Sequence, residues 1–245
     1  MKAVILAGGS GTRLHPLTLV TNKHLLPVFN KPVIYYAIEK LVDAGIGKVM
    51  IVTSPAHIDS FVRLLGSGQH FVPTQSSARQ IQIVYGIQNE PNGIAYGLYI
   101  AEDYIGDDDC VLFLGDNIIT DDIAPAIKKF KQGATLFLKK VDDPERFGVA
   151  EVNKRGKITN LEEKPKKPRS NLAATGLYIY DNSVFDKIRK VQKSDRGEYE
   201  ITEVNKLYLE EGTLRSHMLR GEWFDIGTIE SLHEASRFMK KRAKR

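Results

Sequence analysis

Residues 4–14 read Val-Ile-Leu-Ala-Gly-Gly-Ser-Gly-Thr-Arg-Leu, and this stretch decides the fold. The apolar run 4–7 predicts a buried strand, which leads into a glycine-rich turn at residues 8–13. Glycines let the backbone take positive φ angles and bring its N–H groups close to a ligand. Such a turn forms an anion-binding nest, and Arg13 adds a cation with several donors. We predict a phosphate-binding loop here, although the glycines alone also allow an ordinary strand–helix turn.

The loop does not match two common nucleotide-binding motifs. No Gly-Lys-Ser/Thr follows the glycines, which excludes a Walker A loop. Leu14 stands where a dinucleotide fingerprint needs a third small residue, and residues 30–36 offer no acidic ligand for a ribose. A dehydrogenase is therefore disfavoured. A second cation, Lys23, follows in the stretch Thr-Asn-Lys-His-Leu-Leu-Pro-Val at 21–28.

The composition is that of an ordinary globular protein. Of the 245 residues, 42% are hydrophobic and 27% are charged, enough for one large core. The net charge of +5 equals the charge of five basic residues near the end of the chain, which are Lys240, Lys241, Arg242, Lys244 and Arg245. A terminal basic group is more often a solvated end than a binding surface, so we expect no nucleic-acid partner.

Cysteine and hydropathy patterns bear on the compartment. Cys110 is the only cysteine, so no internal disulfide can form, and its apolar surroundings predict a buried, inert thiol. No apolar run approaches the length of a membrane span, and the first residues lack a signal-peptide pattern. We expect a cytoplasmic protein without a membrane partner.

Strands and helices alternate through the first half of the chain. We predict strands at 48–53, 81–88 and 110–114, and helices at 32–44, 56–65 and 94–104. Alternation of this kind is typical of a mostly parallel sheet with helices on both faces. Ligands of such sheets bind at the carboxyl ends of the strands, where the glycine loop, Gln88 and Asp116 would lie.

The pattern changes after about residue 134. We predict strands at 135–141, 147–152, 157–161 and 172–180, a hairpin turn at 153–156, and helices at 183–190, 200–211 and 228–241. No linker or repeat interrupts the chain. We predict one α/β domain over residues 1–245, a Rossmann-like, mostly parallel sheet with a small β-rich elaboration.

Two carboxylates follow or interrupt apolar runs. Asp116 ends the strand at 110–114 after one glycine, and Asp225 lies between Phe224 and Ile226. Carboxylates at strand ends are favoured Mg²⁺ ligands, while an aspartate that caps the following turn is the alternative. A charge between two apolar neighbours in a buried strand needs a partner.

The motifs in order resemble a known family. The stretches LAGGSGTRLHPLT (6–18) and NKHLLPV (22–28) resemble those of sugar-1-phosphate nucleotidyltransferases, most closely the glucose-1-phosphate thymidylyltransferases, and the resemblance covers nearly the whole chain. It implies transfer of a nucleotidyl group from dTTP to glucose-1-phosphate, with Mg²⁺, to give dTDP-glucose and pyrophosphate. It also implies a nucleotide-binding part at about 1–133 and a sugar-binding part at about 134–245.

The same resemblance implies roles for individual residues. Catalysis falls to Arg13 and Lys23, and the metal to Asp116 and Asp225. The implied nucleotide-binding residues are Leu6, Gly8, Gly9, Gly11, Thr12, Arg13, Gln88 and Gly93. The implied sugar-phosphate residues are Phe147, Gly148, Glu163, Lys164 and Arg196. Taken alone, the stretch 88–95 would be a plain turn. The charged stretches at 161–165 and 194–198 would likewise be solvated faces.

Two departures from the family pattern affect specificity. Pro91-Asn92-Gly93 stands where relatives often have Pro-Asp-Gly, and Phe147 stands where many have tyrosine. UTP or another nucleotide is an alternative to dTTP, because one methyl group gives only about 1–3 kcal/mol of discrimination. A non-catalytic nucleotide-binding regulator is a more distant alternative. The resemblance further implies a homo-oligomer, a dimer or tetramer. Because longer relatives carry a C-terminal helical segment that contributes to a regulatory site, we expect weak or altered end-product feedback.

Overall fold

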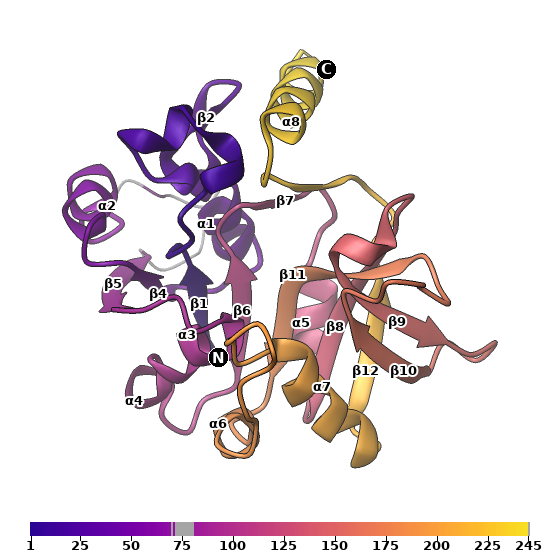
Figure 1. The fold of residues 1–245 in the computed structure, drawn as a ribbon. Coiled ribbons are helices and arrows are strands. Elements are labelled where there is room, and N and C mark those ends of the chain that lie inside the picture. Colours follow the sequence, from indigo (N-terminus) through magenta and orange to yellow (C-terminus); the bar gives the residue numbers. More distant parts are fainter. Residues whose placement is uncertain (70, 72–80, 245) are drawn as a thin grey trace.

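A computed structural model describes residues 1–69, 71 and 81–244. Within them, nine strands form one sheet in the order β10-β9-β11-β6-β1-β4-β5, with β8 paired to β11 and β12 paired to β8 (Figure 1). The strands are β1 (Lys2–Leu6), β4 (Lys48–Thr53), β5 (Gln82–Ile87), β6 (Cys110–Leu114), β8 (Ala134–Lys140), β9 (Gly148–Val152), β10 (Ile158–Glu163), β11 (Leu172–Tyr180) and β12 (Leu214–Met218).

The strands from the first half of the chain pair in parallel. β1 lies between β4 and β6, with Ile5 opposite Ile51 on one side and Phe113 on the other, and β5 pairs with β4. Apolar side chains fill both faces of β1, as in a parallel strand that helices cover on both sides. The predicted strands and the α/β class are confirmed, while residues 72–80 of the chain lie outside the described residues.

Two hydrophobic clusters cover opposite faces of this sheet. The helices are α1 (Val33–Asp43), α2 (Ile58–Leu65), α3 (Ile94–Tyr99), α4 (Glu102–Ile105), α5 (Ala124–Lys129), α6 (Val184–Ile188), α7 (Ile201–Glu210) and α8 (Ile229–Arg242). Ile5 belongs to the cluster with α1 and α2, whereas Val4 belongs to the cluster with α3, α6 and α7. Adjacent residues of β1 thus face opposite cores, as strand geometry requires.

The predicted helix at 94–104 is divided into α3 and α4. The Ala101 N–H donates to the Leu98 carbonyl three residues earlier, at 2.9 Å, so the ladder tightens between the two helices. Leu98, Ala101 and Ile105 still face the same core, and each is fully buried. One apolar face therefore continues across two short helices, and the apolar pattern alone cannot reveal the break.

The second half of the chain continues the same sheet. β11 pairs antiparallel with β6, β8 and β9, and β10 pairs antiparallel with β9. The predicted hairpin is confirmed, since the Gly156 N–H donates to the Asn153 carbonyl at 2.9 Å and Gly156 has a φ of 77°. Figure 1 shows these strands on the side of β6 away from β5.

Besides the two-residue strands β2 (Pro27–Val28) and β3 (Lys31–Pro32) and several short 3-10 helices, the elements that were not predicted are α5, β12, β7 (Asn117–Ile119) and β13 (Trp223–Asp225). The last two form a separate antiparallel pair in which Asp225 lies opposite Asn117. Three-residue strands are too short to show a hydrophobic period. This small pair nevertheless determines the site, because it brings a residue from the end of the chain beside the end of β6.

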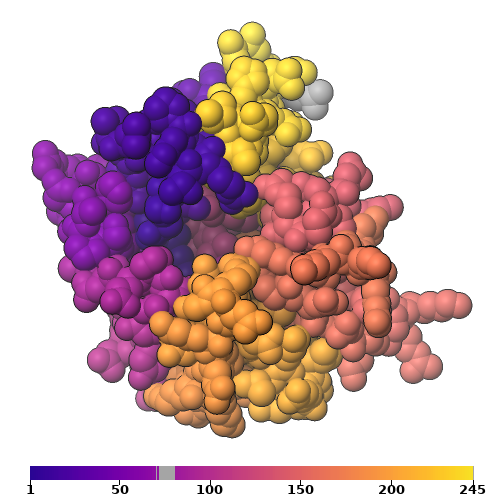
Figure 2. All heavy atoms as spheres, in the orientation of Figure 1, coloured from indigo at the N-terminus to yellow at the C-terminus, as the bar shows by residue number. Residues whose placement is uncertain are grey.

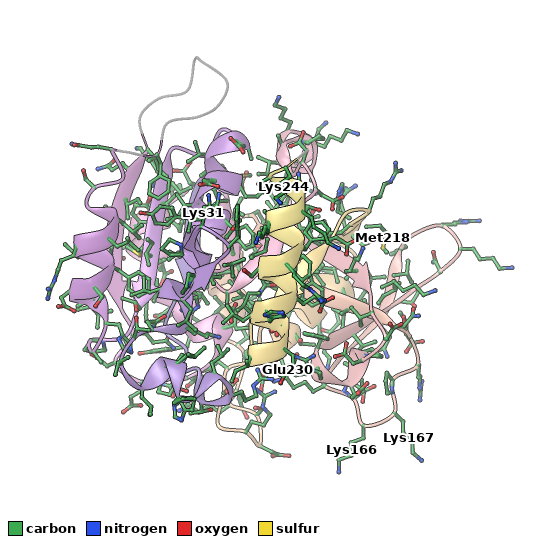
Figure 3. All side chains as sticks on the ribbon, turned by 90° about the horizontal axis from the view of Figure 1, so that it is seen from above. Lys31, Lys166, Lys167, Met218, Glu230 and Lys244 are labelled. Atoms are coloured by element: carbon green, nitrogen blue, oxygen red, sulfur yellow. The ribbon has the colours of Figure 1, made fainter. Side chains whose placement is uncertain are left out.

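α8 lies against the N-terminal part of the molecule. Thr228 caps the helix through a reciprocal pair of hydrogen bonds with Ser231, and Ala235 packs in a third cluster with Tyr36 and Phe224. Figure 3 shows α8 between Glu230, near its start, and Lys244, just beyond its end. The basic residues 240–242 and 244 are exposed, as predicted, and Arg245 lies outside the described residues. No helix among the described residues is long and apolar enough to cross a membrane.

Candidate active site

The glycine-rich turn, hereafter the phosphate loop (residues 8–13), follows β1 and packs against Thr18. Gly11 has a φ of 63°, and a Cβ there would lie 3.0 Å from the Thr18 methyl group. The Thr18 hydroxyl donates to the Gly11 carbonyl at 2.7 Å, while Leu14 is fully buried. Thr12 and Arg13 remain exposed. The loop therefore rests on a rigid support and presents its outer residues to solvent.

The Lys23 side chain packs directly against Gly9 and Gly11 of the phosphate loop. A Cβ on Gly9 would lie 2.9 Å from Lys23 Cε, so glycine makes room for this side chain. The lysine ammonium forms an ion pair with Asp116. Burial alone would lower the pKa of Lys23, but the neighbouring Asp116 carboxylate raises it above its usual value. The predicted second cation is thus charged and fixed to one of the predicted metal ligands.

Hydrogen bonds fix the two residues that flank Lys23, Asn22 and His24. The buried Asn22 donates from Nδ2 to the Ala7 carbonyl at 3.3 Å, and its Oδ1 accepts from the His24 N–H at 2.9 Å. Burial and the Lys23 charge lower the pKa of His24 to about 3, so its imidazole is neutral. These contacts hold the backbone of Lys23, and therefore the position of its ammonium.

Asn117 joins the two predicted metal ligands. Its Nδ2 donates to Asp116 at 2.9 Å and to Asp225 at 3.4 Å. Its Oδ1 accepts from the indole of Trp223 at 2.6 Å and from the Gly176 N–H at 3.1 Å. Asn117 and Trp223 were not predicted as site residues. The sequence signal for Asn117 was its position directly after Asp116. Its contacts with Trp223 and Asp225 depend on the pairing of β7 with β13.

The two carboxylates differ in their electrostatics. Burial would raise the pKa of Asp116, but the Lys23 ammonium lowers it to about 2. Burial and the charge of Asp116 raise the pKa of Asp225 to about 6. A cation beside both groups would relieve this repulsion, and two carboxylates supply the hard oxygens that Mg²⁺ prefers. The residues therefore fit a divalent metal. No third His, Cys, Asp or Glu among the described residues completes a metal cluster, so other ligands would come from substrate or water.

Two adjoining cavities flank this carboxylate pair. The loop cavity, of about 260 Å³, is lined by Leu6, Gly8, Gly9, Lys23, His24, Gln88, Pro91, Gly93, Ile94, Leu114, Asp116 and Glu198. It brings together five of the predicted nucleotide-binding residues: Leu6, Gly8, Gly9, Gln88 and Gly93. Gly11, Thr12 and Arg13 do not line it. Ile94, Leu114 and Glu198 also line the second cavity, so the two spaces meet there.

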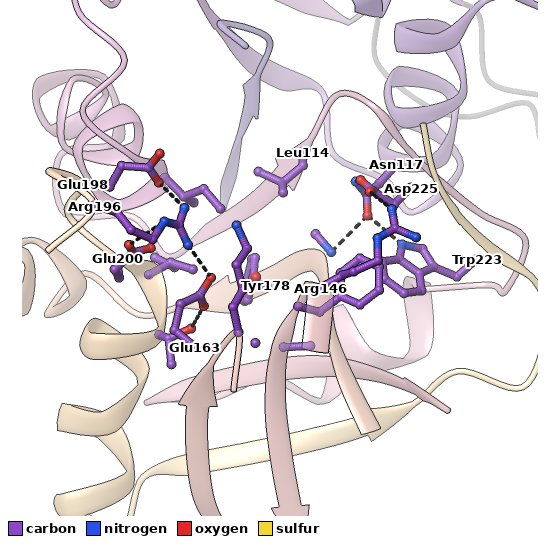
Figure 4. Close-up of a pocket in the computed structure, with 18 of the residues that line it drawn as sticks. Leu114, Asn117, Arg146, Glu163, Tyr178, Arg196, Glu198, Glu200, Trp223 and Asp225 are labelled. Carbon is purple, nitrogen blue, oxygen red and sulfur yellow. Dashed lines mark hydrogen bonds and ion pairs between the residues drawn. The ribbon is translucent and has the colours of Figure 1, made fainter. Parts of the chain in front are cut away.

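The second cavity, hereafter the arginine cavity, has a volume of about 550 Å³ (Figure 4). Its lining includes Arg13, Asp225 and all five predicted sugar-phosphate residues, Phe147, Gly148, Glu163, Lys164 and Arg196. It also includes residues that were not predicted, among them Asn117, Arg146, Tyr178, Glu198, Glu200, Thr202 and Trp223. Figure 2 shows the face hollowed between the N-terminal residues and the orange segment near residue 195.

Arg196 is held by three carboxylates at one wall of the arginine cavity (Figure 4). Its guanidinium lies 3.4 Å from Glu163, 2.9 Å from Glu198 and 3.8 Å from Glu200. Glu163 also accepts a hydrogen bond from the Thr202 hydroxyl at 2.5 Å. The guanidinium is therefore oriented before any ligand arrives, with a shell of acceptors that an anion would replace in part.

Arg146 and Arg13 approach the carboxylate pair from the arginine cavity. The Arg146 guanidinium lies 3.7 Å from the Asp225 carboxylate (Figure 4). A Cβ on Gly227 would lie 2.9 Å from Arg13 Nη2 and 3.1 Å from Asp225 Oδ2. Two arginines thus lie beside Asp225 in the arginine cavity, and Lys23 lies beside Asp116 in the loop cavity. Such an arrangement suits phosphate groups that bind together with a cation.

The contact of Arg13 with Gly227 gives a testable prediction. The Gly227→Ala substitution is expected to lower kcat by about 10–100-fold, because the added methyl group must displace the Arg13 guanidinium from its place beside Asp225. Steady-state kinetics and the melting temperature check this. Gly47→Ala, where a Cβ meets nothing within 4 Å, is the matched control and should leave kcat unchanged. A Gly227→Ala enzyme with the normal kcat would show that the position of Arg13 is not critical.

Comparisons with known proteins agree with this geometry. The sequence pattern of the nucleotidyl transferase family matches residues 2–242. The chain is 46% identical to glucose-1-phosphate thymidylyltransferase of Mycolicibacterium smegmatis and 45% identical to that of Neisseria meningitidis, covering 98% of this chain and 82% of each relative. A Bacillus anthracis crystal structure described as a glucose-1-phosphate thymidylyltransferase in complex with sucrose superimposes with a TM-score of 0.90 at 46% identity, over 97% of this chain and 94% of that one. This chain belongs to the nucleotidyl transferase family and is a nucleotidyltransferase.

Proposed function

We propose that this enzyme transfers a thymidylyl group from dTTP to glucose-1-phosphate, releasing pyrophosphate and forming dTDP-glucose. The observation that carries the proposal is the pair of adjoining cavities, one lined by Lys23 and Asp116 and the other by Asp225, Arg13 and Arg146. Asn117 is hydrogen-bonded to both carboxylates. The names of the relatives in M. smegmatis and N. meningitidis support this choice of substrates. A cytoplasmic location and a homo-oligomeric state belong to the same proposal.

The chemistry requires positioning and charge neutralisation rather than proton transfer. A phosphate monoester is largely dianionic near pH 7, so the sugar phosphate can attack the α-phosphorus of dTTP without a general base. Two anions must be brought together, and the leaving pyrophosphate must be stabilised. In this proposal the phosphate-loop N–H groups and Arg13 bind the triphosphate, while Lys164 and Arg196 hold the sugar phosphate from the arginine cavity.

Asp116 and Asp225 would hold Mg²⁺, which when bound neutralises the charge of the phosphate groups. The shared Asn117 contact supports this role because it keeps both carboxylates at one place. Lys23 keeps Asp116 ionised through their ion pair. In this proposal the Asp116 carboxylate is therefore ionised at neutral pH and available to a metal ion.

The two parts of the chain would divide the substrates between them. Gln88 and Gly93 would contact the base in the nucleotide-binding part, about residues 1–133. Glu163 would accept hydrogen bonds from glucose hydroxyls in the sugar-binding part, about residues 134–245. Phe147 packs edge-on against Trp223, with ring centroids 4.9 Å apart, and supplies an apolar wall where a tyrosine hydroxyl could have made a polar contact.

Pyrophosphate release tests the proposal directly. dTTP, UTP, CTP, GTP and ATP are crossed with glucose-, galactose-, mannose- and N-acetylglucosamine-1-phosphate in the presence of Mg²⁺. We expect turnover with dTTP and glucose-1-phosphate, its loss with excess EDTA, and its return when Mg²⁺ is restored, because without the cation the two carboxylates repel the phosphate groups.

Other outcomes have distinct meanings. Turnover only with UTP would keep the chemistry and overturn the choice of base, which is the alternative that one methyl group leaves open. Silence across the whole panel, from folded protein that still binds dTTP, would overturn the enzymatic proposal in favour of a nucleotide-binding regulator.

A further inference from the structure

One short segment contacts both cavities. Residues 193–199, hereafter the connecting segment, carry Arg196 on the wall of the arginine cavity. Two residues later, Glu198 lines the arginine cavity and the loop cavity together. The sugar-phosphate ligand of the proposed function would therefore touch a segment that also borders the nucleotide.

The connecting segment is bonded to the turn that borders the nucleotide, hereafter the base loop (residues 88–95). The Tyr199 N–H donates to the Asn92 carbonyl at 2.8 Å, and the Ala95 N–H donates to the Tyr199 carbonyl at 3.2 Å. The Lys193 ammonium donates to the Asn92 side-chain oxygen at 2.8 Å. Three hydrogen bonds thus join two segments that lie about a hundred positions apart in the chain.

Gly93 leaves no free space between the two segments. Its φ is +95°, and a Cβ there would lie 2.7 Å from the Tyr199 carbonyl oxygen and 3.0 Å from Glu198 Cβ. The backbones touch at this point, so a shift of residues 198–199 must move Gly93 as well. Gly93 itself lines the loop cavity.

Arg196 provides a reason for such a shift. Its guanidinium is shared among Glu163, at the end of β10, and Glu198 and Glu200, which lie next to Arg196 in the chain. A phosphate bound to Arg196 competes with these carboxylates for the same N–H donors. The Ser194 N–H donates to the Glu198 carbonyl at 2.9 Å, so residues 194–198 form one closed turn. A change in the position of Arg196 would therefore also shift the two residues that flank this turn, Lys193 and Tyr199.

We propose that the connecting segment couples the two subsites, so that glucose-1-phosphate bound at Arg196 increases the affinity of the base loop for the nucleotide, and that the Lys193–Asn92 hydrogen bond is the adjustable link. The inference rests on the proposed function. By thermodynamic linkage, the nucleotide must increase the affinity for glucose-1-phosphate by the same factor. Lys193 is exposed, so the hydrogen bond contributes little to folding and its removal should leave the fold intact.

Equilibrium binding tests this coupling. The dissociation constant of α,β-imido-dTTP, which cannot readily lose pyrophosphate, is measured by calorimetry with Mg²⁺, without and with saturating glucose-1-phosphate. We expect the sugar phosphate to tighten nucleotide binding about fivefold in the wild-type protein, and less than about twofold in Lys193→Met. This variant keeps an aliphatic stem but removes the ammonium, and with it both the hydrogen bond to Asn92 and the contact with the Tyr199 ring. Asn92→Asp keeps an acceptor for Lys193 and should retain the wild-type factor. Lys190→Met removes a neighbouring exposed lysine and is the matched control.

The outcomes separate this inference from the proposed function. Wild-type turnover with dTTP and glucose-1-phosphate, together with a coupling factor of one, would overturn the coupling and leave the function standing. A Lys193→Met protein that keeps the wild-type factor would overturn the link through Lys193. If Lys193→Met melts at a lower temperature, Asn92→Ala removes the acceptor of the same hydrogen bond, and an unchanged factor in that variant would overturn the link equally. Silence in the turnover panel would be a failure of the proposed function instead.

Discussion

Replacing Arg13 with alanine is expected to lower kcat for dTTP and glucose-1-phosphate by about 10²–10³-fold, with a smaller change in KM. Arg13 ends the phosphate loop, and its guanidinium lies beside Gly227 and the Asp225 carboxylate, where the triphosphate and the attacking phosphate would meet. Charge on the leaving pyrophosphate grows in the transition state, so a fixed cation contributes more there than in the ground state. Steady-state kinetics of pyrophosphate release measure both constants.

The controls for Arg13 use the same chain. Arg63→Ala removes an arginine whose side chain is 79% exposed on α2 and should leave kcat unchanged. Arg13→Lys keeps the charge without the planar fork of donors and should recover only part of the activity. The melting temperature should not change, because Arg13 is exposed. A normal kcat with only a raised KM would show that Arg13 binds the ground state and the transition state equally.

Replacing Asp225 with asparagine is expected to lower kcat/KM by at least about 10²-fold and to raise the Mg²⁺ concentration needed for half-maximal rate. The substitution keeps the size of the side chain and an oxygen that can accept from Asn117, but it removes one of the two negative charges that would hold the metal. The backbone pairing of β13 with β7 does not depend on the carboxylate, so the fold should be retained.

The measurement for Asp225 is a titration of pyrophosphate release with Mg²⁺ in each protein. Asp142→Asn changes an exposed aspartate of the second half of the chain and should match the wild-type curve. A variant at position 225 that follows the wild-type Mg²⁺ curve would exclude this carboxylate from the metal site. Activity that recovers at high Mg²⁺ would support a weakened site with intact chemistry.

Much of the fold could be predicted because its strands are short, apolar and bounded by turns. The boundaries of β4, β6 and β11 agree with those predicted, since each strand is buried and ends at a polar or glycine-containing turn. The helix pattern at 94–104 was less informative, because one buried face spans both α3 and α4. β7 and β13 could not be predicted, because each is three residues long and its strand partner lies about a hundred positions away in the chain.

The candidate site likewise contains residues that the sequence alone reveals and contacts that it does not. Leu6, Gly8 and Gly9 line the loop cavity because they follow one strand into one turn, which is a local property. Lys23 and Asp116 are also each recognisable in the sequence, but not their ion pair. Asn117 and Trp223 gain their roles through a hydrogen bond between residues 106 positions apart. No local pattern contains such a contact.

The sequence by itself determined the phosphate loop, the alternation of strands and helices, and the order of motifs that this family shares. Backbone freedom at glycine and the period of apolar residues act within a few positions, so the chain carries them directly. Only the tertiary structure decided that Asp225 shares Asn117 with Asp116, and that the connecting segment touches the base loop. Both contacts depend on the order of strands and on which loops meet at one end of the sheet, and they arise only when distant parts of the chain pack together.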